Sequence, residues 1–279
     1  MEDKGLLVVS FGTTHEDTRI KNIELLEKEL QEASGGMKLY RAWTSKIIME
    51  VLKKRDNIII DDVKAALQRM LDDGIKEVYV QPTHIVNGIE YDMMMADVED
   101  YRDKFEKVEC SSPLLTDDDD YNEVVKAYKN IIDNGEWNTE FGEDFVYSKD
   151  DTAIVFMGHG SDHHVNSVYA ALDYRFKEKR LDNVFVGTVE AYPDFDIVLK
   201  ELKKHNYKKI VLTPLMLVAG DHAKNDMAGD DDDAWKTLFK NEGYQVAVVL
   251  KGMGEYDSIR NIYVRHILEV IGDMKKNVA

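Results

Sequence analysis

The stretch Ala153–His164 reads AIVFMGHGSDHH, and the rest of the chain is best understood from it. Its apolar start, rich in β-branched and aromatic residues, predicts a buried parallel strand over 153–157. The glycines on either side of His159 allow a sharp turn, and the apolar spacing across 165–179 predicts a helix. Open α/β sheets bind ligands beyond the carboxyl ends of their strands, where such turns lie. His159 is therefore a candidate functional residue, with an incidental histidine in a tight turn as the alternative.

Two further histidines, His163 and His164, follow His159 closely. Three imidazoles within six residues are typical of metal-binding chemistry. The position of His163 and His164, however, favours the first turn of the following helix, with both side chains facing water.

The composition is that of a globular protein. The chain has 279 residues, 44% of them hydrophobic and 32% charged, which is enough for one large domain or two lobes. No apolar run approaches the roughly 18 residues of a membrane span, and residues 1–4 lead straight into a strand without the pattern of a secretory signal. A single cysteine, Cys110, allows no internal disulfide and fits a cytoplasmic location.

The net charge of −18 limits the choice of partners. Nucleic acid binding needs a basic face, so this charge argues against it. The same charge would repel an anionic substrate unless lysines or arginines line the site.

Strand-like and helix-like segments alternate along the chain. The predicted strands are 6–11, 37–44, 77–81, 108–112, 153–157, 183–189, 209–213 and 244–250. Alternation of this kind predicts right-handed crossovers and an α/β fold of two similar lobes, each with a mostly parallel sheet flanked by helices. We expect lobes at 1–112 and 152–279, with 113–151 as a linker or crossing segment. Residues 83–91 are expected to form a loop, followed by a helix over 92–105.

The two predicted lobes look like copies of one another. Three pairs lie 132 residues apart: Pro82 and Pro214, Gly88 and Gly220, Glu90 and His222. The strand ends 11–13 and 41–43 are matched with 157–159 and 188–190, which pairs Thr13 with His159 and Trp43 with Glu190. Three strand ends of each lobe should therefore point toward a common cleft.

In the second lobe these strand ends carry His159, Glu190 and His222. Two histidines and one carboxylate suit a first-row divalent metal with open coordination positions. Glu190 could instead be a solvated carboxylate or helix cap, and His222 a capping or surface histidine. Glu90 would face the metal across the cleft as a general base, or be an ordinary loop charge.

Several motifs resemble those of a known family. They are Ser10–Thr14, Trp43–Lys46, Gln81–His84, Gly88–Asp92, Met157–Gly160 and Pro214–Met227. Together they are similar to the anaerobic, class II cobaltochelatases of the CbiK type, which insert Co²⁺ into sirohydrochlorin on the oxygen-independent route to cobalamin. The similarity covers about 5–260, and the run from Gly220 to Met227 is its most specific part. The acidic runs 117–120 and 230–233 depart from the pattern and have no assigned role.

The resemblance implies a fold of two flavodoxin-like lobes and a cytoplasmic lyase that forms nitrogen–metal bonds. It implies that Co²⁺ is held by His159, Glu190 and His222, with Fe²⁺, Ni²⁺ or Zn²⁺ as substitutes in vitro. The implied catalytic residues are His159 as base, Glu90 and His222. The implied substrate-binding residues are Thr13, Trp43, Lys46, His84 and Tyr91. No nucleotide is implied, in agreement with the lack of a Gly-rich ATP-binding motif.

Sirohydrochlorin carries eight carboxylates, so Lys46, Arg41 or Arg55 should line the rim of the first lobe. A ferrochelatase acting on sirohydrochlorin or protoporphyrin would use the same residues. A non-catalytic metal or haem carrier is a further alternative. A periplasmic solute-binding protein also has two similar lobes, but the lack of a signal pattern argues against it. The sequence leaves open the physiological metal, haem binding at an interface, and association into a homo-oligomer.

Overall fold

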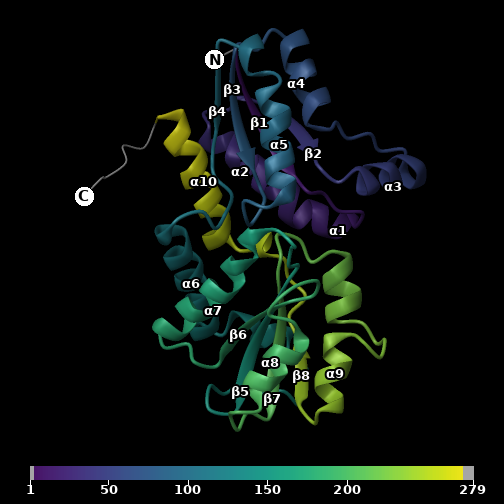
Figure 1. Ribbon diagram of the computed structural model, residues 1–279, viewed down its shortest axis with the longest axis vertical. Helices are drawn as coiled ribbons and strands as arrows, with labels where there is room; N and C mark the ends of the chain where they lie inside the picture. The colour runs from purple at the N-terminus through teal and green to yellow at the C-terminus, as the bar shows by residue number, and fades with distance from the viewer. Residues whose placement is uncertain (1–2, 273–279) are drawn as a thin grey trace. The chain divides into compact units, whose positions relative to one another are not determined.

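The computed structural model describes residues 3–272, which form two compact units. Unit 1 contains the described residues up to Thr116 and those from Gly254 onward, and unit 2 is Asp117–Met253. Each unit has one four-stranded parallel sheet with helices on both faces (Figure 1). The predicted α/β fold with two similar parallel sheets is confirmed. Residues 1–2 and 273–279, which the predicted lobes include, lie outside the described residues.

Unit 1 has the strand order β2-β1-β3-β4. Its strands are β1 (Lys4–Ser10), β2 (Lys38–Trp43), β3 (Glu77–Pro82) and β4 (Lys107–Cys110). Its helices are α1 (Glu16–Thr18), the π-helix η1 (Arg19–Glu24), α2 (Leu25–Ala33), α3 (Lys46–Asp56), α4 (Val63–Asp72), α5 (Ile89–Glu99), the 3₁₀-helix η2 (Arg102–Lys104) and α10 (Asp257–Ile271). The π-helix η1 thus joins α1 directly to α2.

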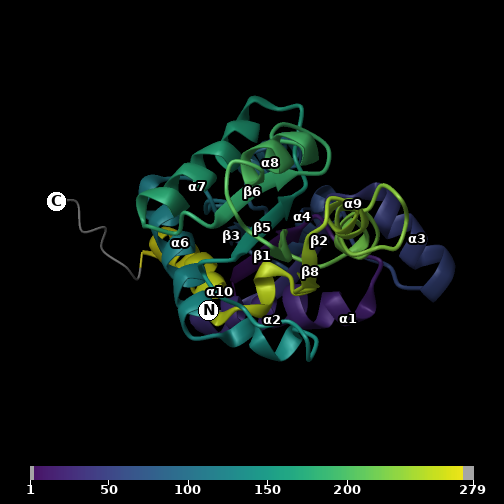
Figure 2. The same ribbon diagram turned by 90° about the horizontal axis from the view of Figure 1, so that it is seen from below.

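The last helix of the described chain packs in unit 1, far in sequence from the strands that it covers. Helix α10 lies beside α2 and β3 (Figure 1, Figure 2). Buried Arg260 donates from Nε to Glu29 Oε2 at 2.8 Å and from Nη1 to the Gly254 carbonyl at 2.9 Å. The Tyr263 hydroxyl donates to the Thr83 carbonyl at 2.9 Å. The division of the chain therefore differs from the lobes predicted at 1–112 and 152–279, because the second of these ranges includes α10.

Unit 2 repeats the topology, with the order β6-β5-β7-β8. Its strands are β5 (Thr152–Gly158), β6 (Val184–Thr188), β7 (Lys209–Leu215) and β8 (Gln245–Val248). Its helices are α6 (Asp118–Asp133), η3 (Glu136–Glu140), η4 (His164–Asn166), α7 (Ser167–Glu178), α8 (Phe195–Leu202), the π-helix η5 (Ala223–Met227) and α9 (Trp235–Asn241).

The alternation of side chains along β5 explains how the sheet of unit 2 is covered. Phe156 faces α6 and α7, with ring centroids 4.6 Å from Tyr128 and 5.4 Å from Phe176. Its neighbours Val155 and Met157 belong to the core on the other face, with α8 and α9. Helix α6 lies within the segment 113–151, so most of this segment is a packed layer of unit 2. Apolar residues such as Tyr128 supply its contact with the sheet.

Helix α5 begins at Ile89, whereas the sequence predicted a loop through residue 91. Gly88 caps the helix in an extended conformation, and Glu90 and Asp92 lie in its first turn. Negative charges are favourable at a helix N-terminus, where the backbone N–H groups point outward. Glu90 and Tyr91 are therefore held by a helix, and the loop prediction for them is wrong.

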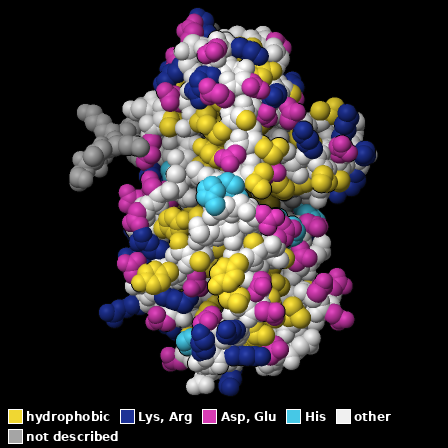
Figure 3. All heavy atoms as spheres, viewed as in Figure 1, with side chains coloured by type: hydrophobic (Ala, Val, Ile, Leu, Met, Phe, Trp, Pro, Cys, Tyr) yellow, Lys and Arg dark blue, Asp and Glu magenta, His cyan; other side chains and the backbone are white. Residues whose placement is uncertain are grey.

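Within residues 3–272, no helix combines the length and the hydrophobicity needed to cross a membrane. Figure 3 shows acidic side chains spread over the visible face with lysines and arginines among them.

Candidate metal centre

Three side chains of unit 2 meet at the carboxyl edge of its sheet. His159 follows β5, Glu190 follows β6, and His222 follows β7 at the start of η5. One ligand atom from each residue lies within 4.8 Å of the other two. The side chains are 43%, 53% and 35% exposed, so an ion from solvent can reach them. The three residues inferred from the sequence as metal ligands thus lie together in the structure.

Main-chain hydrogen bonds bring the first two of these residues together. The Val189 amide donates to the Gly158 carbonyl at 3.0 Å, and the Glu190 amide donates to the His159 carbonyl at 2.9 Å. This close approach requires Gly160, which has φ +88°. A Cβ on Gly160 would lie 2.8 Å from the Ala191 nitrogen. The glycine after His159 is therefore needed both for its conformation and for its small size.

The hydrogen-bond acceptors beside the two histidine rings indicate which nitrogen of each ring carries the proton, and His159 Nδ1 also lies 3.4 Å from Glu190 Oε2. Nδ1 of His159 lies 2.9 Å from the Gly160 carbonyl, and Nδ1 of His222 lies 2.6 Å from Asp226 Oδ2. Because a carbonyl or carboxylate oxygen can only accept, each Nδ1 carries the proton and each Nε2 of a neutral ring keeps its lone pair. The two rings meet edge to face, with centroids 4.6 Å apart. Both Nε2 atoms are therefore in the form that binds a metal.

His163 and His164 do not join this group. They begin the short 3₁₀-helix η4, and His163 Nδ1 accepts a hydrogen bond from the Val165 amide at 3.2 Å. His164 is exposed and His163 is half-buried. The expectation of water-facing residues is therefore met by His164, while His163 serves as a cap.

The structure confirms one part of the internal repeat. The Asp92 amide donates to the Gly88 carbonyl, and the Lys224 amide donates to the Gly220 carbonyl, both at 3.0 Å. The spacing of 132 residues therefore extends from the ends of β3 and β7 into the helices that follow. Glu90 and His222 occupy equivalent positions.

The other two sequence matches are wrong by two residues. The Ser45 amide donates to the Phe11 carbonyl at 3.2 Å, just as Glu190 donates to His159 in unit 2. Gly12, at φ +103°, corresponds to Gly160. Unit 1 therefore has Phe11 where unit 2 has His159, and Ser45 where it has Glu190. Matching by residue type missed this because the hydrogen-bonding register, not the side chain, is what the two copies share.

The segment that follows β3 in unit 1 contains buried polar atoms without a hydrogen-bond partner among the described residues. Among the described residues, Glu90 Oε2 has no hydrogen-bond partner, and neither do the two ring nitrogens of His84. His84 is partly exposed as a residue, but both nitrogens are buried. Burial lowers the pKa of the His84 imidazole from 6.5 to about 4, so this ring is neutral at pH 7.

The other residues assigned to the substrate differ in accessibility. Trp43 is fully buried and lies against Gly12, while buried Thr13 accepts a hydrogen bond from the His15 amide at 3.2 Å. Tyr91 packs against the core of unit 1, and burial raises the pKa of its hydroxyl. Lys46, by contrast, is exposed at the start of α3 and forms no ion pair with the residues that the structure describes.

The two arginines considered for the rim already have partners within unit 1. Arg41 Nε donates to buried Glu27 at 2.8 Å. Arg55 Nε donates to Asp56 at 2.9 Å, and its Nη2 donates to the Thr14 carbonyl at 2.5 Å. Of the three basic residues, Lys46 is therefore the one left available for a substrate carboxylate.

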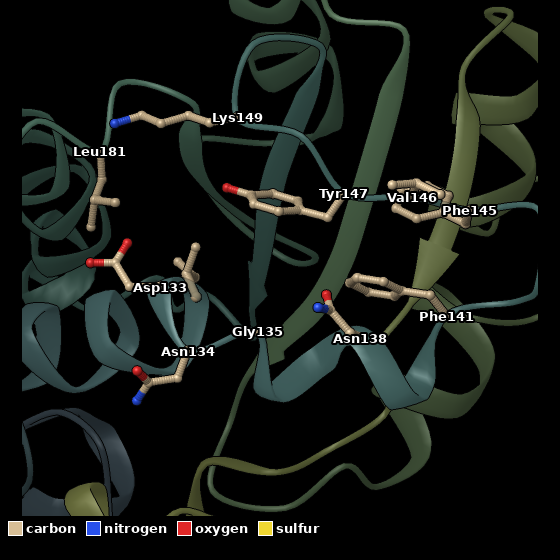
Figure 4. A pocket seen from close by; sticks show the side chains of 11 residues that line it. Asp133, Asn134, Gly135, Asn138, Phe141, Phe145, Val146, Tyr147, Lys149 and Leu181 are labelled. Atoms are coloured by element: carbon tan, nitrogen blue, oxygen red, sulfur yellow. The ribbon is translucent and has the colours of Figure 1, made fainter.

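A pocket of about 600 Å³ lies in unit 2, away from this centre (Figure 4). Phe141, Phe145 and Val146 lie on one side of it, and Lys149 and Leu181 lie on the other. Its residues 132–149 precede the start of β5, whereas His159 follows the end of that strand. The pocket is thus at the opposite end of the sheet and belongs to no part of the metal centre.

Asp226 is the contact of the metal centre that the sequence reading missed. It lies four residues after His222, a spacing that places two side chains on one side of a helical turn. That spacing can be read from the sequence, but it indicates a contact only if the segment is helical, as η5 is.

Comparisons with known proteins show which family the chain resembles. The chain is matched over residues 4–272 by the family described as cobalt chelatase (CbiK). The sirohydrochlorin cobaltochelatase of Salmonella typhimurium is 38% identical over 268 residues, covering 96% of each chain. The sirohydrochlorin cobaltochelatase CbiKC of Nitratidesulfovibrio vulgaris is 32% identical over 278 residues, covering 97% of this chain and 92% of that one.

Among solved structures, SirB from Bacillus subtilis with Fe³⁺ is similar, with a TM-score of 0.65 over 96% of this chain and 95% of that one. At 14% identity, this likeness shows a shared chelatase fold. The close relatives and the match over nearly the whole sequence show more: the chain belongs to the cobalt chelatase (CbiK) family.

Proposed function

We infer that the protein is a sirohydrochlorin cobaltochelatase, a lyase that inserts Co²⁺ into sirohydrochlorin in cobalamin biosynthesis. The observation that carries this inference is the 38% identity to the Salmonella typhimurium enzyme across 96% of both chains. A cytoplasmic location is part of the proposal, because the single cysteine, Cys110, is a free thiol, as reducing compartments maintain.

We propose that His159, Glu190 and His222 hold Co²⁺ before insertion. Two neutral imidazoles and one carboxylate bind borderline divalent ions and leave coordination positions open. A chelatase needs those open positions, because the nitrogens of the macrocycle must displace water from the ion. A closed site with four protein ligands would retain the metal.

Insertion also requires that two pyrrole N–H protons leave the macrocycle. We propose His159 as the first acceptor, since Nε2 regains a lone pair that can take a proton once the ion has passed to the macrocycle. Glu90 is proposed as the second, with His222 completing the catalytic set. Support for Glu90 comes from its buried Oε2, which lacks a partner among the described residues and is available to accept a proton.

For the substrate carboxylates we propose Lys46, whose exposed ammonium group has no competing ion pair among residues 3–272. Thr13 and Trp43 are proposed to act by holding the turn at Gly12, since both are buried. The buried neutral ring of His84 and the half-buried Tyr91 are proposed to line the substrate site in unit 1.

An anaerobic assay with sirohydrochlorin tests the activity. We expect Co²⁺ to cause the change in the visible spectrum that marks a metallated macrocycle, without any nucleotide. His159→Ala and His222→Ala should each lower the rate by orders of magnitude, whereas His164→Ala, a matched loss of an exposed histidine outside the group, should not.

Competition among metals in the same assay separates the alternatives. Faster turnover with Fe²⁺ than with Co²⁺ would favour a ferrochelatase, and Ni²⁺ and Zn²⁺ serve as further competitors. Metal binding without turnover of the free macrocycle would indicate a carrier instead of an enzyme.

A further inference from the structure

The two histidines of the metal centre are held by different kinds of acceptor. Nδ1 of His159 meets the neutral carbonyl of Gly160, whereas Nδ1 of His222 lies 2.6 Å from the carboxylate of Asp226. Asp226 lies on the π-helix η5, which His222 caps. Buried Ala223 and Met227 fix this helix against the core of unit 2.

We propose that Asp226 is a positioning residue that makes His222 the stronger of the two histidine ligands. Its carboxylate holds the proton on Nδ1 and orients the ring, so that Nε2 points away from η5. A negative partner also makes the imidazole a better donor to a cation, as second-layer carboxylates do in other metal sites. The proposal rests on the proposed binding of Co²⁺ by His159, Glu190 and His222.

Two observations argue that this contact serves the metal and not the stability of the fold. The Asp226 side chain is 45% exposed, so its removal leaves no cavity in the core. Its one ion pair among residues 3–272 is with His222. The carboxylate near Nδ1 of His159 is Glu190 Oε2, at 3.4 Å compared with the 2.6 Å between His222 and Asp226, and Glu190 belongs to the proposed ligand set. His222 is therefore the anchor of the site, and His159 is the ligand freer to exchange.

The chain contains a matched control for charge. Asp221 precedes His222 directly, is exposed, and accepts a hydrogen bond at 3.0 Å from Asn225 Nδ2. Asp221→Asn removes one negative charge from the same turn but leaves the ring of His222 oriented. A loss that comes only from weaker attraction of cations would appear equally in both asparagine variants.

The test is calorimetric titration of Co²⁺ into the full-length, metal-free protein, with the visible absorption of bound Co²⁺ recorded alongside. Asp226→Asn should weaken Co²⁺ binding by about 10- to 100-fold, the usual effect of losing such a partner, and should change the ligand-field bands. Asp226→Glu should recover most of the affinity, and Asp221→Asn should stay within about twofold of the wild type. Thermal unfolding should be nearly the same for all four proteins, because both aspartates are partly or fully exposed.

Wild-type affinity and spectrum in Asp226→Asn would overturn the positioning role while leaving the proposed metal site intact. An equal loss in Asp221→Asn would also overturn it, in favour of a general charge effect. A wild-type protein that binds no Co²⁺ would overturn the proposed metal site and this inference together.

Discussion

Glu190 and Glu90 are both carboxylates at sheet edges, but they have different surroundings. Glu190 lies beside two histidines in unit 2, and Glu90 is equivalent in the repeat to His222. We have proposed the first as a metal ligand and the second as a proton acceptor, and a change that removes only the charge distinguishes these roles.

Glu190→Gln should weaken Co²⁺ binding by tenfold or more, about 1.4 kcal/mol, and high Co²⁺ should partly restore the rate. Glu90→Gln should leave Co²⁺ affinity nearly unchanged and lower kcat at saturating metal, because proton removal is impaired. Calorimetry and steady-state rates on both variants measure this. The reverse pattern would exchange the two roles.

His84 gives a prediction about stability at low pH. Its pKa of about 4 in the folded protein lies below the usual 6.5, so the unfolded chain binds the proton more readily. The stability that comes from neutral His84 is therefore complete above pH 6.5 and is lost as the pH falls toward 4. Between pH 6.5 and 5 this loss is on the order of 2 kcal/mol.

His84→Gln removes the titrating group. The unfolding free energy of the wild type should therefore fall by about 2 kcal/mol relative to that of the variant between pH 6.5 and 5. Urea unfolding at several pH values measures the difference, and other titrating groups cancel in the comparison. A pH-independent difference would mean that the imidazole is solvated in the folded protein.

At the level of elements, the strand β5 and the turn after it were the most predictable features. A continuous apolar run ended by Gly-His-Gly indicated both, and the observed strand extends the predicted one by one residue at each end. The start of α5 was not predictable in the same way, because the apolar residues of 83–91 obscured its cap at Gly88. The repeat indicated the third proposed ligand, His222, whereas the residues of unit 1 equivalent to His159 and Glu190 could be identified only from the hydrogen-bonding register.

The turn after β5 can be tested through its glycine. Gly160→Ala adds a Cβ at φ +88° and 2.8 Å from the Ala191 nitrogen, so it combines backbone strain with a clash. Gly243 is a matched control, with φ +91° and nothing within 4 Å of the Cβ that alanine would add. Gly243→Ala should cost about 1–2 kcal/mol of stability from strain alone.

Gly160→Ala should cost more than this control and should also weaken Co²⁺ binding, because it separates the chain at His159 from the chain at Glu190. Denaturant unfolding and Co²⁺ titration of both variants check the prediction. Equal losses in the two variants would show that the loop can adjust without disturbing the site.

On the scale of the whole molecule, the sequence indicated two similar halves but not which helix completes each one. Helix α10 follows unit 2 in the chain, yet Arg260 and Tyr263 fasten it to unit 1. Local patterns of hydrophobicity describe a helix but not the distant sheet on which it packs. For the same reason, the sequence predicts a linker over 113–151, where α6 packs in unit 2.

Unit 2 contains all three proposed ligands and Asp226 within Asp117–Met253. We therefore expect a fragment of residues 117–253 to fold on its own and to bind Co²⁺ about as tightly as the full chain. It should not metallate sirohydrochlorin, because Lys46 and Glu90 belong to unit 1. Circular dichroism, Co²⁺ titration and the insertion assay test the three statements. A folded fragment without Co²⁺ affinity would show that unit 1 contributes to the metal centre.

The hydrogen bond from the Glu190 amide to the His159 carbonyl has a consequence for turnover. Because the sheet itself holds these residues together, the empty site keeps its shape, and folding does not depend on the ion. The ion can then be delivered to a product and replaced without any unfolding between cycles. Added Co²⁺ should raise the melting temperature only by the amount that its affinity and concentration require. Removal of Co²⁺ with a chelator should return the melting temperature to that of the metal-free protein and should not denature it.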